Sequence, residues 1–126
     1  MPSRSSGAAT VFFDPEEKYI WALALDAQGR VYVATGDKGV IYRVAADGTS
    51  EVFCRTESSN VTSLLPGADG QMFASTESPG RVLRIAPSGK AFVLLDSPYR
   101  EVRALRAGAA GTIYAAAVNG KPGAPE

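Results

Sequence analysis

Histidine is absent from the 126-residue sequence, and cysteine occurs once, at Cys54. Without histidine, the chain lacks the commonest physiological general base and the commonest metal ligand. A single cysteine excludes a disulfide bond within the chain. These absences remove many hydrolytic and metal-dependent sites, so we expect no catalytic residues, no metal site and no cofactor.

An excess of charge of either sign is also missing, because 13 lysines and arginines balance 13 aspartates and glutamates. A neutral chain offers no net electrostatic attraction to nucleic acid or to a lipid surface. No stretch approaches the roughly 18 consecutive apolar residues of a membrane-spanning helix. We therefore expect neither nucleic acid nor a membrane as a partner.

Glycine and proline are well represented, with 13 and 8 residues, while hydrophobic residues make up 45% and charged residues 21% of the chain. Such proportions are ordinary for a globular protein and argue against disorder. Frequent glycine and proline with few long apolar runs favour many short strands joined by turns.

A repeat organises the sequence. Gly29, Gly70 and Gly111 lie 41 residues apart (29 to 70 and 70 to 111). The same offset aligns Leu23 with Leu64 and Leu105, Ile20 with Val61 and Val102, and Tyr32 with Phe73 and Tyr114. A period of about 40 to 50 residues with four strands in each unit is typical of a β-propeller blade.

The strand pattern within one unit supports this interpretation. Residues 19–25 form an apolar segment suited to a strand packed between neighbours, and residues 31–35 are β-branched and aromatic. Glycine-containing turns separate these from residues 40–44 and 51–54, the predicted third and fourth strands. Helical spacing is not sustained anywhere. The predicted class is all-β, a partial β-propeller of about 2.5–3 four-stranded antiparallel blades.

The predicted organisation is an open arc. Its parts are a flexible N-terminus (1–9), the propeller region (10–118) with a strand of a preceding blade (10–13), one blade (19–54), a second blade (60–95) and a half blade (101–117), and a tail or linker rich in proline and glycine (119–126). Closed propellers use about four to eight blades, so each end of the arc exposes an apolar face. We expect either a homodimer that closes a six-bladed ring or further blades in a longer parent chain.

The segment ALALDAQGRVYVAT (22–35), followed by GVIYRV (39–44), resembles bacterial NHL-like and virginiamycin B lyase-like propeller repeats. It is also similar to uncharacterised bacterial proteins described as WD-repeat-like, and the resemblance covers about residues 10–117. The resemblance implies the fold and leaves the function open, since propellers include lyases, lactonases, lectins and scaffolds. The lyase and lactonase relatives need a histidine or a carboxylate-and-asparagine metal cluster on the axis. This chain has no clear counterpart, so those activities do not carry over.

Trp21, Thr62 and Arg103 occupy one repeat position near the start of the first strand. An aromatic ring, a hydroxyl and a guanidinium at equivalent places are suited to lining a pocket for a polar or planar ligand. The alternative is that Trp21 packs between blades and that Arg103 extends to solvent.

The loops that join the fourth strand to the next first strand, and the second strand to the third, differ between repeats. Variable loops on a constant framework are where binding sites are commonly built, although surface loops also diverge without function. The candidate ligand-binding residues are therefore Trp21, Thr62, Arg103, Lys18, Asn60, Arg100 and Glu101.

Two other features are interpreted as structural. Cys54 aligns with Phe13 and Leu95, so we expect a small buried core residue and no nucleophile. Arg100, Arg103 and Arg106 do not form one basic patch on a strand, and Asp96 and Glu101 lie near enough to neutralise them.

The preferred hypothesis is a non-catalytic binding or scaffold module that engages a partner protein or a small polar ligand through its variable loops. One alternative is part of a propeller enzyme, related to lyases or lactonases, whose active site needs further blades or a second chain. Another is a ring-forming lectin, but a lectin should repeat an aromatic residue and a carboxylate in each blade, and the series Trp21, Thr62, Arg103 does not.

The N-terminal segment has no apolar core of the kind found in signal peptides. We expect a cytoplasmic location if Met1 is the true start, and export remains open if the chain is part of a longer protein.

Overall fold

A computed structural model describes residues 19–119. Three predictions fall outside the described residues: the strand at 10–13, the flexible N-terminus at 1–9 and the role of Lys18. Of the predicted tail at 119–126, only Asn119 is described. Between 19 and 119 the chain forms ten strands and two single-turn 3-10 helices, which confirms the all-β prediction. Among residues 19–119, no helix is long or apolar enough to span a bilayer.

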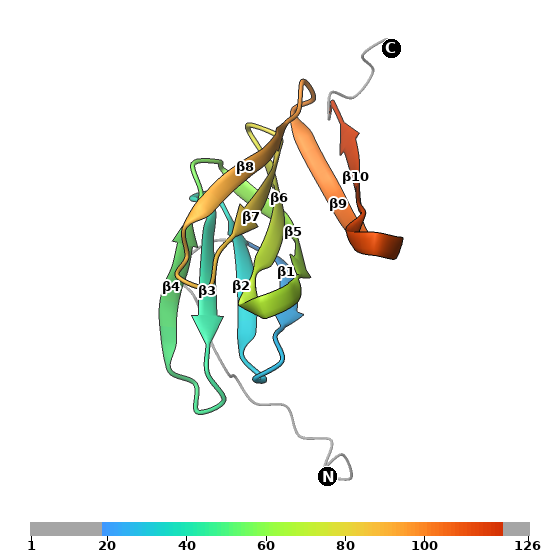
Figure 1. The fold of residues 1–126 in the computed structure, drawn as a ribbon. Coiled ribbons are helices and arrows are strands. Elements are labelled where there is room, and N and C mark those ends of the chain that lie inside the picture. Colours follow the sequence, from blue (N-terminus) through green and yellow to red (C-terminus); the bar gives the residue numbers. More distant parts are fainter. Residues whose placement is uncertain (1–18, 120–126) are drawn as a thin grey trace, which may run out of the picture.

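The elements follow one another along the chain with short connections (Figure 1). Their order is β1 (Tyr19–Leu25), β2 (Val31–Gly36), β3 (Val40–Val44), β4 (Ser50–Arg55), β5 (Asn60–Pro66), η2 (Ala68–Gly70), β6 (Met72–Glu77), β7 (Arg81–Ile85), β8 (Ala91–Asp96), β9 (Glu101–Ala107), η3 (Ala109–Gly111) and β10 (Ile113–Val118).

The strands pair as antiparallel neighbours in sequence order. β1 to β4 form a four-stranded sheet, here called the first blade, and β5 to β8 pair in the same way to form the second blade. β9 and β10 form a hairpin that is joined to the second blade through one bridge between Glu77 and Glu101. This arrangement is the partial β-propeller that the repeat predicts.

Each first hairpin turns at the recurring glycine. Gly29, Gly70 and Gly111 all have φ near +79°, a left-handed conformation that side chains other than glycine rarely adopt. The residue before the glycine is also left-handed in the second and third turns, at Asp69 and Ala110, so these two turns resemble each other more than they resemble the first.

The hydrophobic core lies between blades rather than within one sheet. The first interface is formed by buried residues of both blades, namely Tyr32, Ala34, Ile41, Phe53, Cys54, Val61, Met72, Ala74, Leu83 and Ile85. A smaller cluster joins the second blade to the hairpin through Val82, Val102 and Leu105. The inner strands β1, β5 and β9 therefore stand next to one another around one side of the arc.

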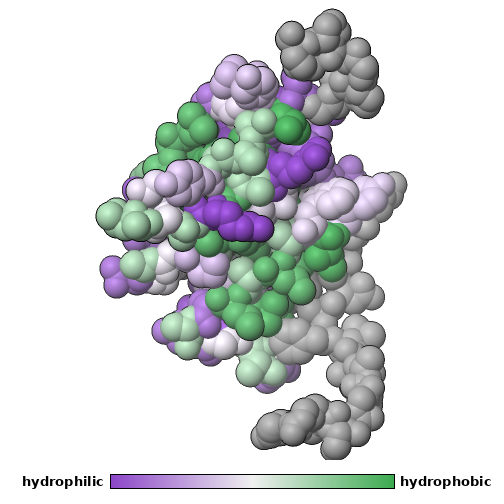
Figure 2. Space-filling view, turned by 90° about the vertical axis from the view of Figure 1, so that its right-hand side faces the viewer, coloured by the Kyte–Doolittle hydropathy of each residue, from purple (hydrophilic) through white to green (hydrophobic). Residues whose placement is uncertain are grey.

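Apolar side chains remain exposed beyond these two interfaces. Ile20, Leu23 and Leu25 are exposed on β1, as are Leu94 and Leu95 on β8. Figure 2, which views the side that carries β1, β9 and β10, shows hydrophobic patches separated by strongly hydrophilic residues. Both blades thus carry apolar surface that nothing in the described part of the chain covers.

Candidate functional site

A β-bulge interrupts the first strand of all three repeats at the same place. The pairing skips Trp21 between Ile20 and Ala22, and it skips Thr62 and Arg103 at the corresponding points of β5 and β9. A bulge residue does not follow the regular up-and-down alternation of side chains along a strand, so its side chain points in a different direction. The framework therefore directs one variable side chain from each repeat in an equivalent manner.

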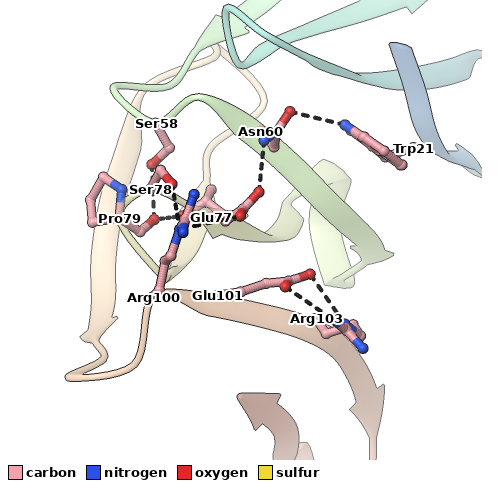
Figure 3. Close-up of polar contacts among 10 residues, drawn as sticks. Trp21, Ser58, Asn60, Glu77, Ser78, Pro79, Arg100, Glu101 and Arg103 are labelled. Atoms are coloured by element: carbon pink, nitrogen blue, oxygen red, sulfur yellow. Dashed lines mark hydrogen bonds and ion pairs between the residues drawn. The ribbon is translucent and has the colours of Figure 1, made fainter. Parts of the chain in front are cut away.

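These bulge residues line one pocket. A cavity of about 450 Å³ is lined by Trp21, Asn60, Thr62, Glu77, Glu101 and Arg103. Its walls come from β1, β5, β6 and β9. Figure 3 labels all of its lining side chains except Thr62. The volume lies within the range of roughly 300 to 1,000 Å³ that is usual for small-molecule sites.

Asn60 connects the walls of this pocket. Its Oδ1 accepts hydrogen bonds from Trp21 Nε1 at 3.0 Å and from the backbone N–H of Asp37 at 3.1 Å. Its Nδ2 donates to Glu77 Oε1 at 2.7 Å (Figure 3). The side-chain amide of Asn60 is therefore fully oriented, and it fixes the indole of one blade relative to the carboxylate of the next.

Gly36 makes room for this contact. A Cβ added at Gly36 would lie 2.2 Å from Trp21 Nε1 and 2.4 Å from Asn60 Oδ1. The repeat equivalent of Gly36 is Glu77, and the equivalent of Trp21 is the small Thr62. In the first blade the small residue is Gly36 and the large one Trp21, whereas in the second blade the small residue is Thr62 and the large one Glu77. The position of the Trp21 side chain is therefore set by its contacts with Gly36 and Asn60.

Glu77 is the functional candidate that sequence reasoning missed. It ends β6, and its backbone pairs directly with that of Glu101. Its Oε2 lies 3.5 Å from Arg100 Nε, and the same nitrogen donates to Ser78 Oγ at 3.3 Å. The available signal was its repeat position beside the variable loop, where the first blade has glycine.

Glu101 and Arg103 form a two-point ion pair on β9. Arg103 Nε and Nη2 donate to the two carboxylate oxygens at 3.1 and 3.0 Å. Hydrogen bonding to Glu101 and its negative charge raise the pKa of Arg103 above its ordinary value. Two such donors hold the plane of the carboxylate in register with the guanidinium.

Thr62 ties the floor of the pocket to the hairpin. Its hydroxyl donates to the backbone carbonyl of Val102, and it lies 2.8 Å from Ser75 Oγ. Together with the bridge between Glu77 and Glu101, this contact joins β9 to β5 and β6.

Five of the seven sequence-predicted residues therefore line one cavity: Trp21, Asn60, Thr62, Glu101 and Arg103. Arg100 does not line the cavity but forms an ion pair with Glu77, which does. Lys18 lies outside the described residues. Their role in binding a ligand stays a prediction.

A second cavity of about 570 Å³ lies at the hairpin turns of the two blades. Asp26, one of its lining residues, accepts hydrogen bonds from the backbone of Gln28 and Arg30, from Arg30 Nε and from Tyr32 Oη. Burial alone would raise the pKa of Asp26, but these hydrogen bonds outweigh it and hold the pKa below its ordinary value. Such a carboxylate is committed to the turn, so we assign it a structural role.

Two further kinds of site are relevant within residues 19–119, a metal site and a reactive cysteine. No group of three or more acidic or cysteine residues suited to a metal ion occurs among residues 19–119. Cys54 is buried in the first interface, and this burial raises the pKa of its thiol. A protonated buried thiol behaves as a small apolar residue, not as a nucleophile.

Comparison with known proteins bears on the fold alone. No family model matches the sequence, and no curated protein matches it. Among solved structures, the chain is similar to selenomethionine-substituted virginiamycin B lyase from Staphylococcus aureus, with a TM-score of 0.69 and 18% sequence identity. The match covers 81% of this chain and 36% of the lyase chain, so the described fold corresponds to about a third of that propeller. The chain thus has a propeller-like fold.

Proposed function

We propose that the chain is a non-catalytic binding module and that the pocket around Trp21 and Glu101 holds a small polar ligand. The observation that supports this best is that three equivalent bulges carry three chemically different side chains into one cavity. Three repeats of one rigid framework that hold different side chains at one pocket are suited to recognising a ligand.

The interactions around the pocket favour binding over catalysis. The backbones of Glu77 and Glu101 pair across β6 and β9, which brings two acidic residues to one pocket, and this observation favours an enzyme. Each carboxylate, however, is already engaged by an arginine, Arg100 or Arg103. Carboxylates held in this way are fixed acceptors, whereas acid–base catalysis needs a group that exchanges its proton with a substrate.

The binding function can be tested with the intrinsic fluorescence of Trp21, because the chain contains a single tryptophan. The purified chain is titrated with free amino acids, nucleosides, small amides and hexoses, and hits are verified by calorimetry. The double variant Glu101→Ala/Arg103→Ala removes one wall of the pocket and should weaken a hit at least about tenfold, equivalent to about 1.4 kcal/mol.

The matched control removes a different surface ion pair, Arg81 and Asp96 on the outer strands of the second blade. Arg81→Ala/Asp96→Ala should bind like the parent chain. A probe set with no member that changes the fluorescence, or equal loss in both double variants, would contradict the proposed function.

For the scaffold aspect, we propose that the exposed apolar faces on β1 and β8 pack against further blades. The supporting observation is that Ile20 and Leu94 are exposed, whereas their repeat equivalents Val61 and Phe53 are buried where two blades meet. Light scattering on the purified chain tests the source of these blades. A discrete two-chain particle indicates a second copy closing a ring, and a monomer that binds a hydrophobic dye indicates blades of a longer chain. A monomer that binds no dye would overturn this part of the proposal.

A further inference from the structure

We infer that the ligand of this pocket is a neutral ring rich in hydroxyl groups, of the hexopyranose class. This inference rests on the proposed binding function and adds the chemical class of the ligand. It draws on the charge balance of the pocket, on the state of the indole and on the arrangement of donors and acceptors.

The charged groups at the pocket cancel. Two carboxylates, Glu77 and Glu101, are matched by two guanidiniums, Arg100 and Arg103, each at 3.0 to 3.5 Å from its partner. An anionic ligand would have to approach the carboxylates of Glu77 and Glu101, and a cationic ligand the guanidinium of Arg103. Because an unmatched charge also loses its hydration on entering a pocket, a neutral ligand is favoured over both.

The indole of Trp21 offers an apolar platform. Trp21 is 51% exposed, yet the only polar hydrogen of its side chain is already donated to Asn60. Tyr19 stacks on it with ring centroids 5.4 Å apart and 20° between the planes, which limits tilting of the ring. What remains available is a negatively polarised π face, and this face attracts the C–H groups of a saturated ring carrying oxygen substituents. A cation would be attracted as well, but the charge balance opposes it.

The polar groups beside the platform supply donors and acceptors in adjacent pairs. Each oxygen of Glu101 accepts one hydrogen bond from Arg103 and has a further lone pair for another donor. Arg103 keeps guanidinium hydrogens that its carboxylate partner does not use. A hydroxyl group donates and accepts at once, so vicinal hydroxyls fit such a carboxylate–guanidinium pair. An amide or an aromatic base presents fewer groups of this dual kind.

The pocket is a single site and not a repeated one. Its platform comes from the first blade, its hydroxyl from the second and its ion pair from the hairpin. The lectin alternative, with the same aromatic and carboxylate in each blade, is therefore a different proposal, and one ligand per set of three repeats is expected here.

Pyranose rings of different charge provide the test. Methyl β-D-glucopyranoside, methyl β-D-galactopyranoside and N-acetylglucosamine are neutral, glucosamine is cationic, and glucuronate is anionic. Each is titrated into the parent chain with Trp21 fluorescence and calorimetry as readouts. At least one neutral pyranoside should bind about tenfold or more tightly than both charged rings.

Two single variants should each shift the binding preference toward a charged ring, one toward the anion and the other toward the cation. Glu101→Gln leaves the pocket with an excess positive charge, so glucuronate should gain relative to the neutral ring. Arg103→Gln leaves an excess negative charge, so glucosamine should gain. The matched controls are Glu51→Gln and Arg81→Gln, which change the same residue types on the outer strands and should keep the order of the parent chain.

The outcomes separate the inference from the proposed function. If amino acids, nucleosides or amides move the Trp21 signal and no pyranoside does, the binding function holds and the ligand class is wrong. If a charged ring binds as tightly as every neutral one, the ligand class is also wrong. If no probe of any class binds, both fall together.

Discussion

The two blades present equivalent repeat positions on their outer strands, but these positions differ in how deeply they are buried. Phe53, the bulge residue of β4, is 5% exposed in the first interface, while its equivalent Leu94, the bulge residue of β8, is 50% exposed. The first interface is closed by β7, which supplies Leu83 and Ile85, and the described hairpin supplies no third strand. Burial in this fold is therefore a property of the neighbouring blade, and the residue type at a position does not decide it.

The largest expected effect comes from a charge placed at one repeat position in two environments. Val61 is fully buried between the blades, whereas its equivalent Ile20 is 49% exposed. Val61→Asp should unfold the chain, because burying an unpaired carboxylate costs several kcal/mol and net stability is only about 5 to 15 kcal/mol. Ile20→Asp should remain folded by circular dichroism. A folded Val61→Asp variant would refute the assigned core.

A truncation at the fourth-strand bulge compares the two interfaces directly. Phe53→Ala should lower the free energy of unfolding by about 3 to 5 kcal/mol, since a large ring leaves a cavity in a packed core. Leu94→Ala should change it by less than about 1 kcal/mol in the isolated chain. Chemical denaturation measures both. Equal losses in the two variants would mean that Leu94 is covered, as a second copy would do.

Acid should act on the first hairpin through Asp26, whose side chain is only 7% exposed. Because the folded pKa of Asp26 lies below its ordinary value, its stabilisation is complete above about pH 4 and is lost as the pH falls through the folded pKa. Asp26→Asn should lower stability by about 1.5 to 3 kcal/mol at neutral pH. It should also flatten the decline in melting temperature below about pH 4.

The control for this measurement is Asp69, an exposed aspartate in the corresponding turn of the second blade. Asp69→Asn should change stability at neutral pH by no more than about 0.5 kcal/mol. A loss as large as that of Asp26→Asn would show that the turns, and not the buried hydrogen bonds, carry the effect.

The smallest effect is expected at the edge of the pocket, where the first blade has Gly36 and the second has Glu77. In Gly36→Ala the added methyl group meets two side chains, so the indole of Trp21 moves away from Asn60. The stability loss should stay near or below about 1 kcal/mol, because the ring is half exposed. The tryptophan emission should shift to longer wavelength. An unchanged spectrum would mean that Gly36 does not seat Trp21.

Much of the fold was predictable because the repeat carries it. Apolar residues at constant offsets and glycines at the turns specify each hairpin locally, and the observed left-handed Gly29, Gly70 and Gly111 follow from that pattern. The repeat also pointed to Trp21 and Arg103, since unlike residues at one framework position stand out in an otherwise regular alignment.

Other features of the site were decided only in three dimensions. A bulge depends on how two strands pair, so it cannot be predicted from the sequence of one strand. The hydrogen bond from Trp21 to Asn60 and the meeting of Glu77 with Glu101 depend on how closely one blade packs on the next. The blades and their divergent positions could be derived from the sequence alone, because those depend on local pairing and turn geometry. The packing of blade on blade decided that these positions share one pocket, because only that packing fixes distances between residues about 40 apart in the chain.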